Sequence, residues 1–162
     1  MNIFVLDYNA RLAAQAHVDK HCIKMILESA QLLCGALKMY QVNDDKLYKL
    51  SHKNHPSAIW TRTSKDNFVW LSDLALYLGE EYTYRYGKVH KSIEIIKHAQ
   101  QYISVLPDVG LTNFVQAMPD EYKKTDTVDA YRAYYRFSKT KLLVYTKRKP
   151  PEWIKDIAKQ NE

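Results

Sequence analysis

Residues 19–40, DKHCIKMILESAQLLCGALKMY, carry the broadest apolar helical pattern in the chain. At about 100° per residue, apolar side chains cover most of the circumference of one long helix, for which Asp19 is a candidate N-cap. A helix of this kind is normally buried, so we expect it to form the centre of the fold. The apolar surface consists of Val18, Cys22, Met25, Ile26, Leu32, Leu33, Ala36 and Leu37, widened by Ile23, Leu27 and Cys34.

One narrow polar stripe interrupts this apolar surface. It consists of Lys20, His21, Lys24, Glu28 and Gln31, which fall within about 100° of arc at i, i+3 and i+4 spacing. Burying an ammonium, an imidazole and a carboxylate costs several kcal/mol unless they are paired or line a wet cleft. The pattern therefore favours a cleft lined by the stripe. The alternative is an exposed seam in which a Lys24–Glu28 pair contributes about 0.3–0.5 kcal/mol.

The whole chain has the size and composition of one helical domain. Its 162 residues contain only four glycines and five prolines, which favours long helices over a turn-rich sheet fold. We expect an all-α fold of about five helices, with a short extended N-terminal segment, a single domain at 1–150 and a surface tail at 151–162. The formal net charge of +6 is compatible with a polyanion partner such as nucleic acid.

The cysteines and the hydropathy pattern bear on the cellular compartment. Cys22 and Cys34 would lie about 18 Å apart on one helix, too far for a disulfide, and two buried thiols suggest a reducing cytoplasm. The N-terminus lacks the features of a signal peptide, and no window of 18 apolar residues occurs, so no membrane partner is expected.

The other periodic stretches predict the remaining elements. Residues 3–6 form a short apolar run. Residues 41–53 are polar and lack periodicity, which predicts a flexible loop. A short helix is predicted at 9–15, with Asn9 as N-cap. A helix that begins at Pro56 is followed, after a break, by a second helix capped by Ser64 and ended by Gly87. Further helices are predicted over 92–105 and from Asp126 or Thr127 to about Tyr145.

Three further groups combine polar and aromatic side chains. The first group is Asn54, His55, Trp60, Arg62 and Asn67; the second is Tyr82, Tyr84, Arg85, Tyr86, His90 and Lys91; the third is Tyr131, Arg132, Tyr134, Tyr135, Arg136, Lys139, Lys141, Lys147, Arg148 and Lys149. Interleaved aromatic and basic residues are typical of surfaces that stack bases and hold phosphates. Each group also has a structural alternative: a capping histidine and a core tryptophan for the first, ordinary packing for the second, and a solvated helix face for the third.

The polar stripe offers a specific chemistry. An amine beside a carboxylate can form a Schiff base, while the carboxylate stabilises a sugar cation and moves protons. No metal site is expected, because neither HExxH nor a zinc-ligand pattern occurs, although the pairs His17/His21 and His52/His55 are close in sequence. No cofactor is expected either, since a Walker loop and a GxGxxG motif are both missing.

At these residues the chain resembles the pyrimidine-dimer DNA glycosylases (the endonuclease V family), and it is also similar to uncharacterised phage-type proteins. The match covers most of residues 1–90 in order and spacing, and is weaker at 131–135 and the lysines that follow. It rests on Asp19, Lys20, Lys24, Glu28, Gln31, Leu32 and Leu33, and on Asn54, His55, Pro56, Trp60, Glu80, Glu81, Tyr82, Arg85 and Tyr86.

The resemblance implies a compact all-α DNA-repair enzyme. In that family an amine attacks C1′ of a damaged nucleotide, a helix Glu assists, and the resulting imine permits strand cleavage by β-elimination. Glu28 matches the position of the catalytic Glu. The family nucleophile is an N-terminal α-amine exposed by removal of Met, but here Asn2 follows Met1, and Asn disfavours that removal.

Several functions therefore stay open at the level of sequence. The nucleophile is the amine of Met1, Lys20 or Lys24, or lyase activity has been lost; His21 completes the candidate catalytic group. The leading expectation is a duplex-DNA glycosylase and abasic-site lyase. The alternatives are a non-catalytic protein that sequesters a free nucleotide, and a small structural DNA-binding protein.

Overall fold

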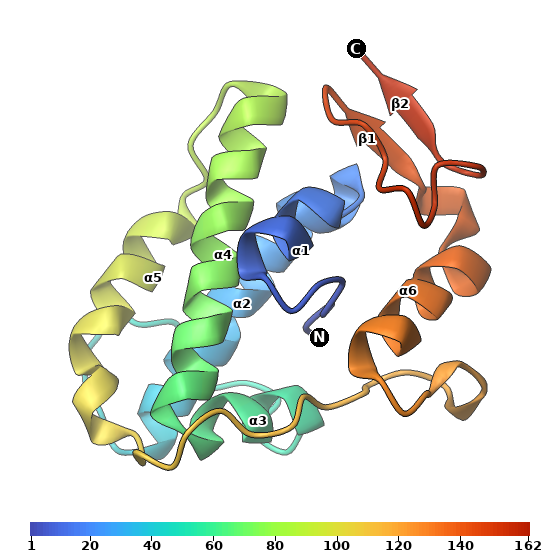
Figure 1. Cartoon of the computed structure of the whole chain (residues 1–162). Helices are drawn as coiled ribbons and strands as arrows, with labels where there is room; N and C mark the ends of the chain where they lie inside the picture. Colours follow the sequence, from blue (N-terminus) through green and yellow to red (C-terminus); the bar gives the residue numbers. More distant parts are fainter.

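The computed structural model describes all 162 residues, and it is mostly helical, with six α-helices and one two-stranded sheet (Figure 1). The prediction of a mainly helical fold is confirmed, with six helices in place of about five. The α-helices are α1 (Ala10–Ala16), α2 (Asp19–Met39), α3 (Pro56–Thr63), α4 (Lys65–Tyr86), α5 (Ser92–Ala99) and α6 (Thr127–Ser138). The strands are β1 (Val144–Thr146) and β2 (Lys159–Asn161), and the 3-10 helices are η1 (Gln100–Val105), η2 (Asp120–Tyr122) and η3 (Thr140–Leu142).

Helices α2 and α4 form the centre of the core, as the apolar pattern of residues 19–40 predicts. Ile26, Leu33 and Leu37 of α2 are completely buried, and so are Phe68 and Leu78 of α4. In Figure 1, α5 lies on one side of α4, while α6 and the strand pair lie on the other side. A long irregular segment between η1 and α6 connects the two sides.

The helix ends follow local capping chemistry. The side chains of Asn9 and Ser64 accept hydrogen bonds from the backbone N–H groups of the first turns of α1 and α4, as predicted. His55 caps α3 in the same way, which was the structural alternative for this residue. Gly87 ends α4 in the left-handed conformation at φ 68°, which glycine adopts without strain. The prediction for Asp19 was wrong: Val18 occupies the N-cap, and Asp19 is the first residue of α2.

The C-terminal part differs from the expected long helix to residue 145. Helix α6 ends at Ser138, and Tyr145 lies in β1, which pairs in parallel with β2. The extended backbone turns the Tyr145 ring into the core, where its hydroxyl donates to the carbonyl of Ala16 at 2.7 Å. Within residues 151–162, expected as a surface tail, Ile154 is completely buried.

Two further predictions concern the cysteines and the membrane. Cys22 and Cys34 are both free and buried, as their spacing on α2 predicts. Burial raises the pKa of the Cys22 thiol to about 12, so this thiol stays protonated and unreactive. None of the helices combines the length and the apolar character needed to cross a membrane.

Candidate active site

The α-amine of Met1 lies next to the carboxylate of Glu28. The amine nitrogen is 3.5 Å from Oε1 of Glu28, and the two side chains are only 4% and 13% exposed. Glu28 thus pairs with the amine of a residue 27 positions earlier rather than with Lys24 on its own helix. The pair places a potential nucleophile and a proton acceptor side by side, partly shielded from water.

Asn2 fixes the backbone that carries this amine. Its Nδ2 donates to the carbonyl of Ala117 at 2.9 Å, and its Oδ1 accepts from the backbone N–H of Ile3 and from the hydroxyl of Tyr131. The following residues 3–6 are buried, as their apolar run predicts. The position of the amine is therefore set by contacts with the segment before α6 and with α6 itself.

His21 is buried and does not lie on the open surface. Its ring stacks on Phe4 at a centroid distance of 4.4 Å, and its Nδ1 shares a hydrogen bond of 2.7 Å with the hydroxyl of Tyr135. Burial, together with the charges of Lys139 and Lys24, lowers the pKa of His21 to about 4. His21 is thus a neutral packing residue at pH 7 that supports the N-terminal segment.

The rest of the polar stripe forms the open face of α2. Lys20 and Lys24 are exposed, and Gln31 is half-buried. Ile23 and Leu27, which were expected to extend the buried surface, are each 39% exposed on the same face. The open face of α2 is therefore a mixed basic and apolar surface with Glu28 at its edge.

His55 is the N-cap of α3, and the charges of the Met1 amine and of Glu28 both act on its ring. Its Nδ1 accepts a hydrogen bond from the backbone N–H of Ser57 at 3.0 Å, so the neutral ring carries its proton on Nε2. Burial lowers the pKa of His55, the positive Met1 amine lowers it further, and Glu28 opposes both. A neutral His55 therefore keeps an Nε2–H donor that is not used in the cap, and Asn54, the preceding residue, is exposed.

The other members of this group have structural contacts. Trp60 is buried against Phe114 and Trp70, at centroid distances of 5.1 and 6.4 Å. Asn67 is fully buried, and its Nδ2 donates to the carbonyl of Trp60 and to the hydroxyl of Thr112. Its Oδ1 accepts a hydrogen bond from the backbone N–H of Thr112. Arg62 donates to the carbonyl of Lys53 and so braces the loop before α3. The structure does not bring Trp60 or Asn67 to the Met1–Glu28 pair.

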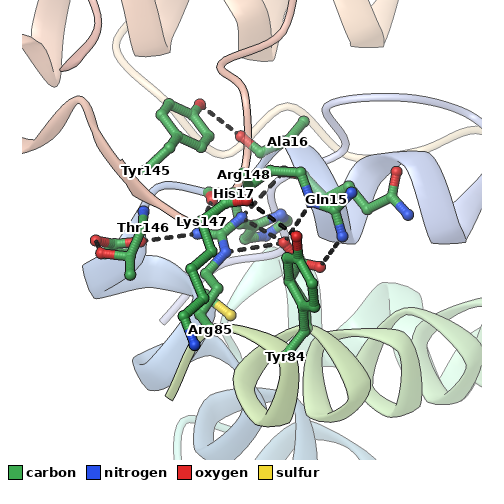
Figure 2. Close-up of polar contacts among 12 residues, drawn as sticks. Gln15, Ala16, His17, Tyr84, Arg85, Tyr145, Thr146, Lys147 and Arg148 are labelled. Carbon is green, nitrogen blue, oxygen red and sulfur yellow. Dashed lines mark hydrogen bonds and ion pairs between the residues drawn. The ribbon is translucent and has the colours of Figure 1, made fainter. Parts of the chain in front are cut away.

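Arg85 is the centre of a buried polar network (Figure 2). Its guanidinium donates to Glu81 at 2.8 Å, to Asp19 at 3.0 Å and to the carbonyls of Gln15 and His17. Glu81 also accepts two hydrogen bonds from Arg148, at 3.0 and 2.6 Å. The network joins α2, α4 and the segment after β1, so Arg85 acts structurally.

The aromatic residues at the end of α4 form a small cluster. The ring of Tyr82 lies 5.5 Å from that of Tyr86 and 5.3 Å from that of His90, and all three are half-buried. Lys91 is exposed nearby in sequence. Tyr84 points to the C-terminal segment, where its hydroxyl donates to the carbonyl of Lys147. The cluster is accessible but makes no contact with Glu28.

Helix α6 divides its polar residues between the core and the surface. Tyr131 and Tyr135 are completely buried, and Arg132 donates to the carbonyl of Leu6 and pairs with Asp7. Lys139 lies 4.7 Å from the centroid of the Tyr134 ring, and its charge acts on His21 together with that of Lys24.

The basic strip that follows α6 is only partly free. Arg136 is held by Asp156 and Arg148 by Glu81, so internal carboxylates already neutralise both arginines. Lys141, Lys147 and Lys149 are exposed. Lysines supply most of the strip's positive charge that remains available to a partner.

Comparison with known proteins and a search for metal sites add no assignment. The structure contains no group of three or more His, Cys, Asp and Glu side chains that could hold a metal ion. No family model, curated protein or solved structure matches the chain.

Several important residues were not predicted from the sequence. In the sequence, Asn2 is notable only as a residue that disfavours removal of Met1, whereas in the structure it anchors the N-terminal segment. The sequence presents Phe4 as part of an apolar run and Asp19 as a cap, and no short motif marks them as partners of His21 and Arg85. Only the i, i+4 spacing of Glu81 and Arg85 signalled the buried network.

Proposed function

We propose that this protein is a DNA-binding repair-type enzyme with glycosylase and abasic-site lyase chemistry on damaged or modified bases. The observation that carries the proposal is the α-amine of Met1 at 3.5 Å from the Glu28 carboxylate. An α-amine has an ordinary pKa of about 8 and a lysine amine about 10.4, so α-amines as a class are the readier nucleophiles at neutral pH. This ranks Met1 ahead of Lys24 and Lys20.

In the proposed reaction the neutral amine attacks C1′ of the damaged nucleotide. The bond from C1′ to the base breaks, its electron pair leaves with the base, and the base takes up a proton. Ring opening then breaks the C1′–O4′ bond, the nitrogen loses its protons to form the imine, and O4′ takes a proton. Loss of a C2′ proton expels the 3′ phosphate oxygen, and water hydrolyses the imine to free the amine.

Glu28 has two roles in this scheme. Its negative charge stabilises the positive charge that develops on the sugar as the base departs. Its oxygen accepts a proton from the amine and returns one to O4′, for which the 3.5 Å separation needs only slight adjustment. The Nε2–H of a neutral His55 is a further donor that is not used in the cap.

The charge distribution supports a duplex partner for this site. Lys20 and Lys24 lie on the same face of α2 as Glu28, the charges of Lys24 and Lys139 both act on His21, and backbone phosphates are the natural partner of such cations. The exposed Ile23 and Leu27 lie on the same face of α2 as Lys20 and Lys24, where they can pack against sugars or bases of a distorted duplex.

Borohydride trapping on duplex DNA with an abasic site tests the proposal, because borohydride reduces the imine to a stable amine. We expect a covalent adduct whose peptide mass maps to Met1. The Glu28→Gln variant should keep the fold and lose most of the activity, whereas the exposed Glu94→Gln variant serves as a matched control and should stay active.

The trapping result also separates the alternatives. An adduct on Lys24 would move the nucleophile to the helix while keeping the reaction. Absence of any adduct, under conditions where a control lyase is trapped well, would reject the lyase proposal. Tight binding of a free nucleotide without affinity for duplex DNA would then favour the sequestering function.

A further inference from the structure

A pocket lies between α1, α6 and the C-terminal segment. Its volume is about 410 Å³, within the usual range for small-molecule sites, and it shares no lining residue with the Met1–Glu28 pair. Its ionisable lining residues are Arg132, Arg148, Lys149, Asp7 and Glu152. The lining therefore carries three cations and two carboxylates on a largely apolar wall, and Glu81, outside the lining, already pairs with Arg148.

The two arginines of the pocket are fixed before any ligand arrives. Arg148 uses Nε and Nη2 for a two-point contact with Glu81, and its guanidinium stacks over the Tyr84 ring at 4.7 Å. Arg132 uses Nε for the carbonyl of Leu6 and Nη2 for Asp7. Their side chains remain 30% and 31% exposed, and no partner occupies either Nη1. Each arginine thus presents a fixed donor group to solvent without losing side-chain entropy on binding.

The two carboxylates on the lining are already engaged. Asp7 contacts Arg132 and accepts the backbone N–H of Asn9 at 2.8 Å. Glu152 pairs with Lys155 and its side chain is 85% exposed. Lys149 is exposed and forms no ion pair within the protein, so it is the one lining cation with its full charge free.

The remaining lining suits a planar organic group. Trp153 is half-buried, with Arg132 stacked on its ring at 5.2 Å. Apolar side chains of Leu6, Leu12 and Ala16 complete the wall on the side of α1. Aromatic and aliphatic walls of this kind bind nucleobases through their flat faces.

We infer that this pocket binds the phosphate monoester of a nucleoside, with the phosphate at Arg132, Arg148 and Lys149 and the nucleoside against Trp153. Arginine donors fixed by carboxylates match the oxygens of a phosphate, which accept several hydrogen bonds at once. The ligand is either a free nucleoside 5′-monophosphate or the 5′-phosphate end of a DNA strand. The inference stands independently of the reaction at Glu28.

The test is calorimetric titration of the full-length protein with deoxyadenosine 5′-monophosphate, deoxyadenosine and inorganic phosphate. We expect the monophosphate to bind at least about tenfold more tightly than the other two, because each lacks one half of the contacts. Lys149→Glu should weaken monophosphate binding by about tenfold or more. Lys88→Glu makes the same change of charge at an exposed site outside the pocket and should have little effect.

Two further measurements locate the ligand and its source. The indole N–H signal of Trp153 in NMR spectra, identified by its loss in Trp153→Phe, should shift on titration. Tighter binding of a 5′-phosphorylated single-stranded octamer than of its 5′-hydroxyl form would identify strand ends as a source, while binding of the mononucleotide alone would identify the free nucleotide. Either result supports the pocket.

Three outcomes would overturn the inference. Equal affinities for the monophosphate and the nucleoside would exclude phosphate recognition. Equal effects of Lys149→Glu and Lys88→Glu would reduce the binding to overall charge. Shifts confined to Lys24 and Gln31, with the Trp153 signal unmoved, would place the nucleotide on the open face of α2 instead.

Discussion

Replacement of Arg85 by methionine should strongly destabilise the protein. The side chain is completely buried, and its guanidinium serves Glu81, Asp19 and two backbone carbonyls. Methionine fills much of the volume but leaves the carbonyls of Gln15 and His17 without a donor and two carboxylates with fewer partners. Breaking a buried ion pair by removing one partner costs about 3–5 kcal/mol, and Arg85→Met should lie in this range. For a chain of this size that corresponds to a fall in Tm of roughly 6–20 °C.

Urea unfolding followed by far-UV circular dichroism measures this loss, with Arg11→Met as a matched control. Arg11 pairs with Glu80 at 3.5 Å, but the side chains are 55% and 64% exposed, so the control should cost no more than about 1 kcal/mol. Similar losses for the two variants, or a loss below about 1 kcal/mol for Arg85→Met, would refute the reasoning that burial makes this network important. An unchanged urea slope would show that the unfolded state is unaffected.

Three other predictions concern acid, the core and DNA binding. Burial lowers the pKa of His17 to about 3 and of His21 to about 4, from 6.5 when unfolded, so the unfolded chain binds protons first as the pH falls. The free energy of unfolding should have its full value above about pH 6.5 and should fall by roughly 2 kcal/mol per histidine by pH 5. A free energy of unfolding that does not change over this pH range, measured by urea titration, would contradict this. Tyr135→Phe removes the hydroxyl that contacts Nδ1 of the buried His21 and should cost about 1–3 kcal/mol, measured by the same unfolding assay. Lys139→Ala with Lys141→Ala should weaken duplex binding and reduce the log–log salt slope by about 1 per lost phosphate contact; unchanged affinity and slope would identify the strip as a solvated face.

The sequence was most informative where structure depends on neighbouring residues. The apolar pattern of residues 19–40 predicted the central helix, because periodicity at i, i+3 and i+4 reflects burial directly. The caps at Asn9, His55 and Ser64 were predictable because each side chain bonds a backbone group two or three residues away.

Contacts between distant residues could not be read in this way. Asp19 has the pattern of a cap, but its carboxylate instead accepts from Arg85 and from the N–H and hydroxyl of Thr146. Helical periodicity through Tyr145 suggested a longer α6, while the strand is selected by pairing with β2 and by the Tyr145–Ala16 contact. His21 shares the stripe with Lys24 by spacing, and only the position of Phe4 shows that it faces inward.

The anchoring of Asn2 also determines when the candidate site can form during synthesis. Glu28 is presented by a helix made early, but the partners of Asn2 lie 115 residues downstream at Ala117 and 129 residues downstream at Tyr131. At translation rates of about 5–20 residues per second, Tyr131 is added roughly 6–26 s after Asn2. During that interval the nascent chain contains Glu28, but the contacts of Asn2 that fix the Met1 amine have not yet formed. Such long-range contacts also raise the contact order of the fold, which slows folding.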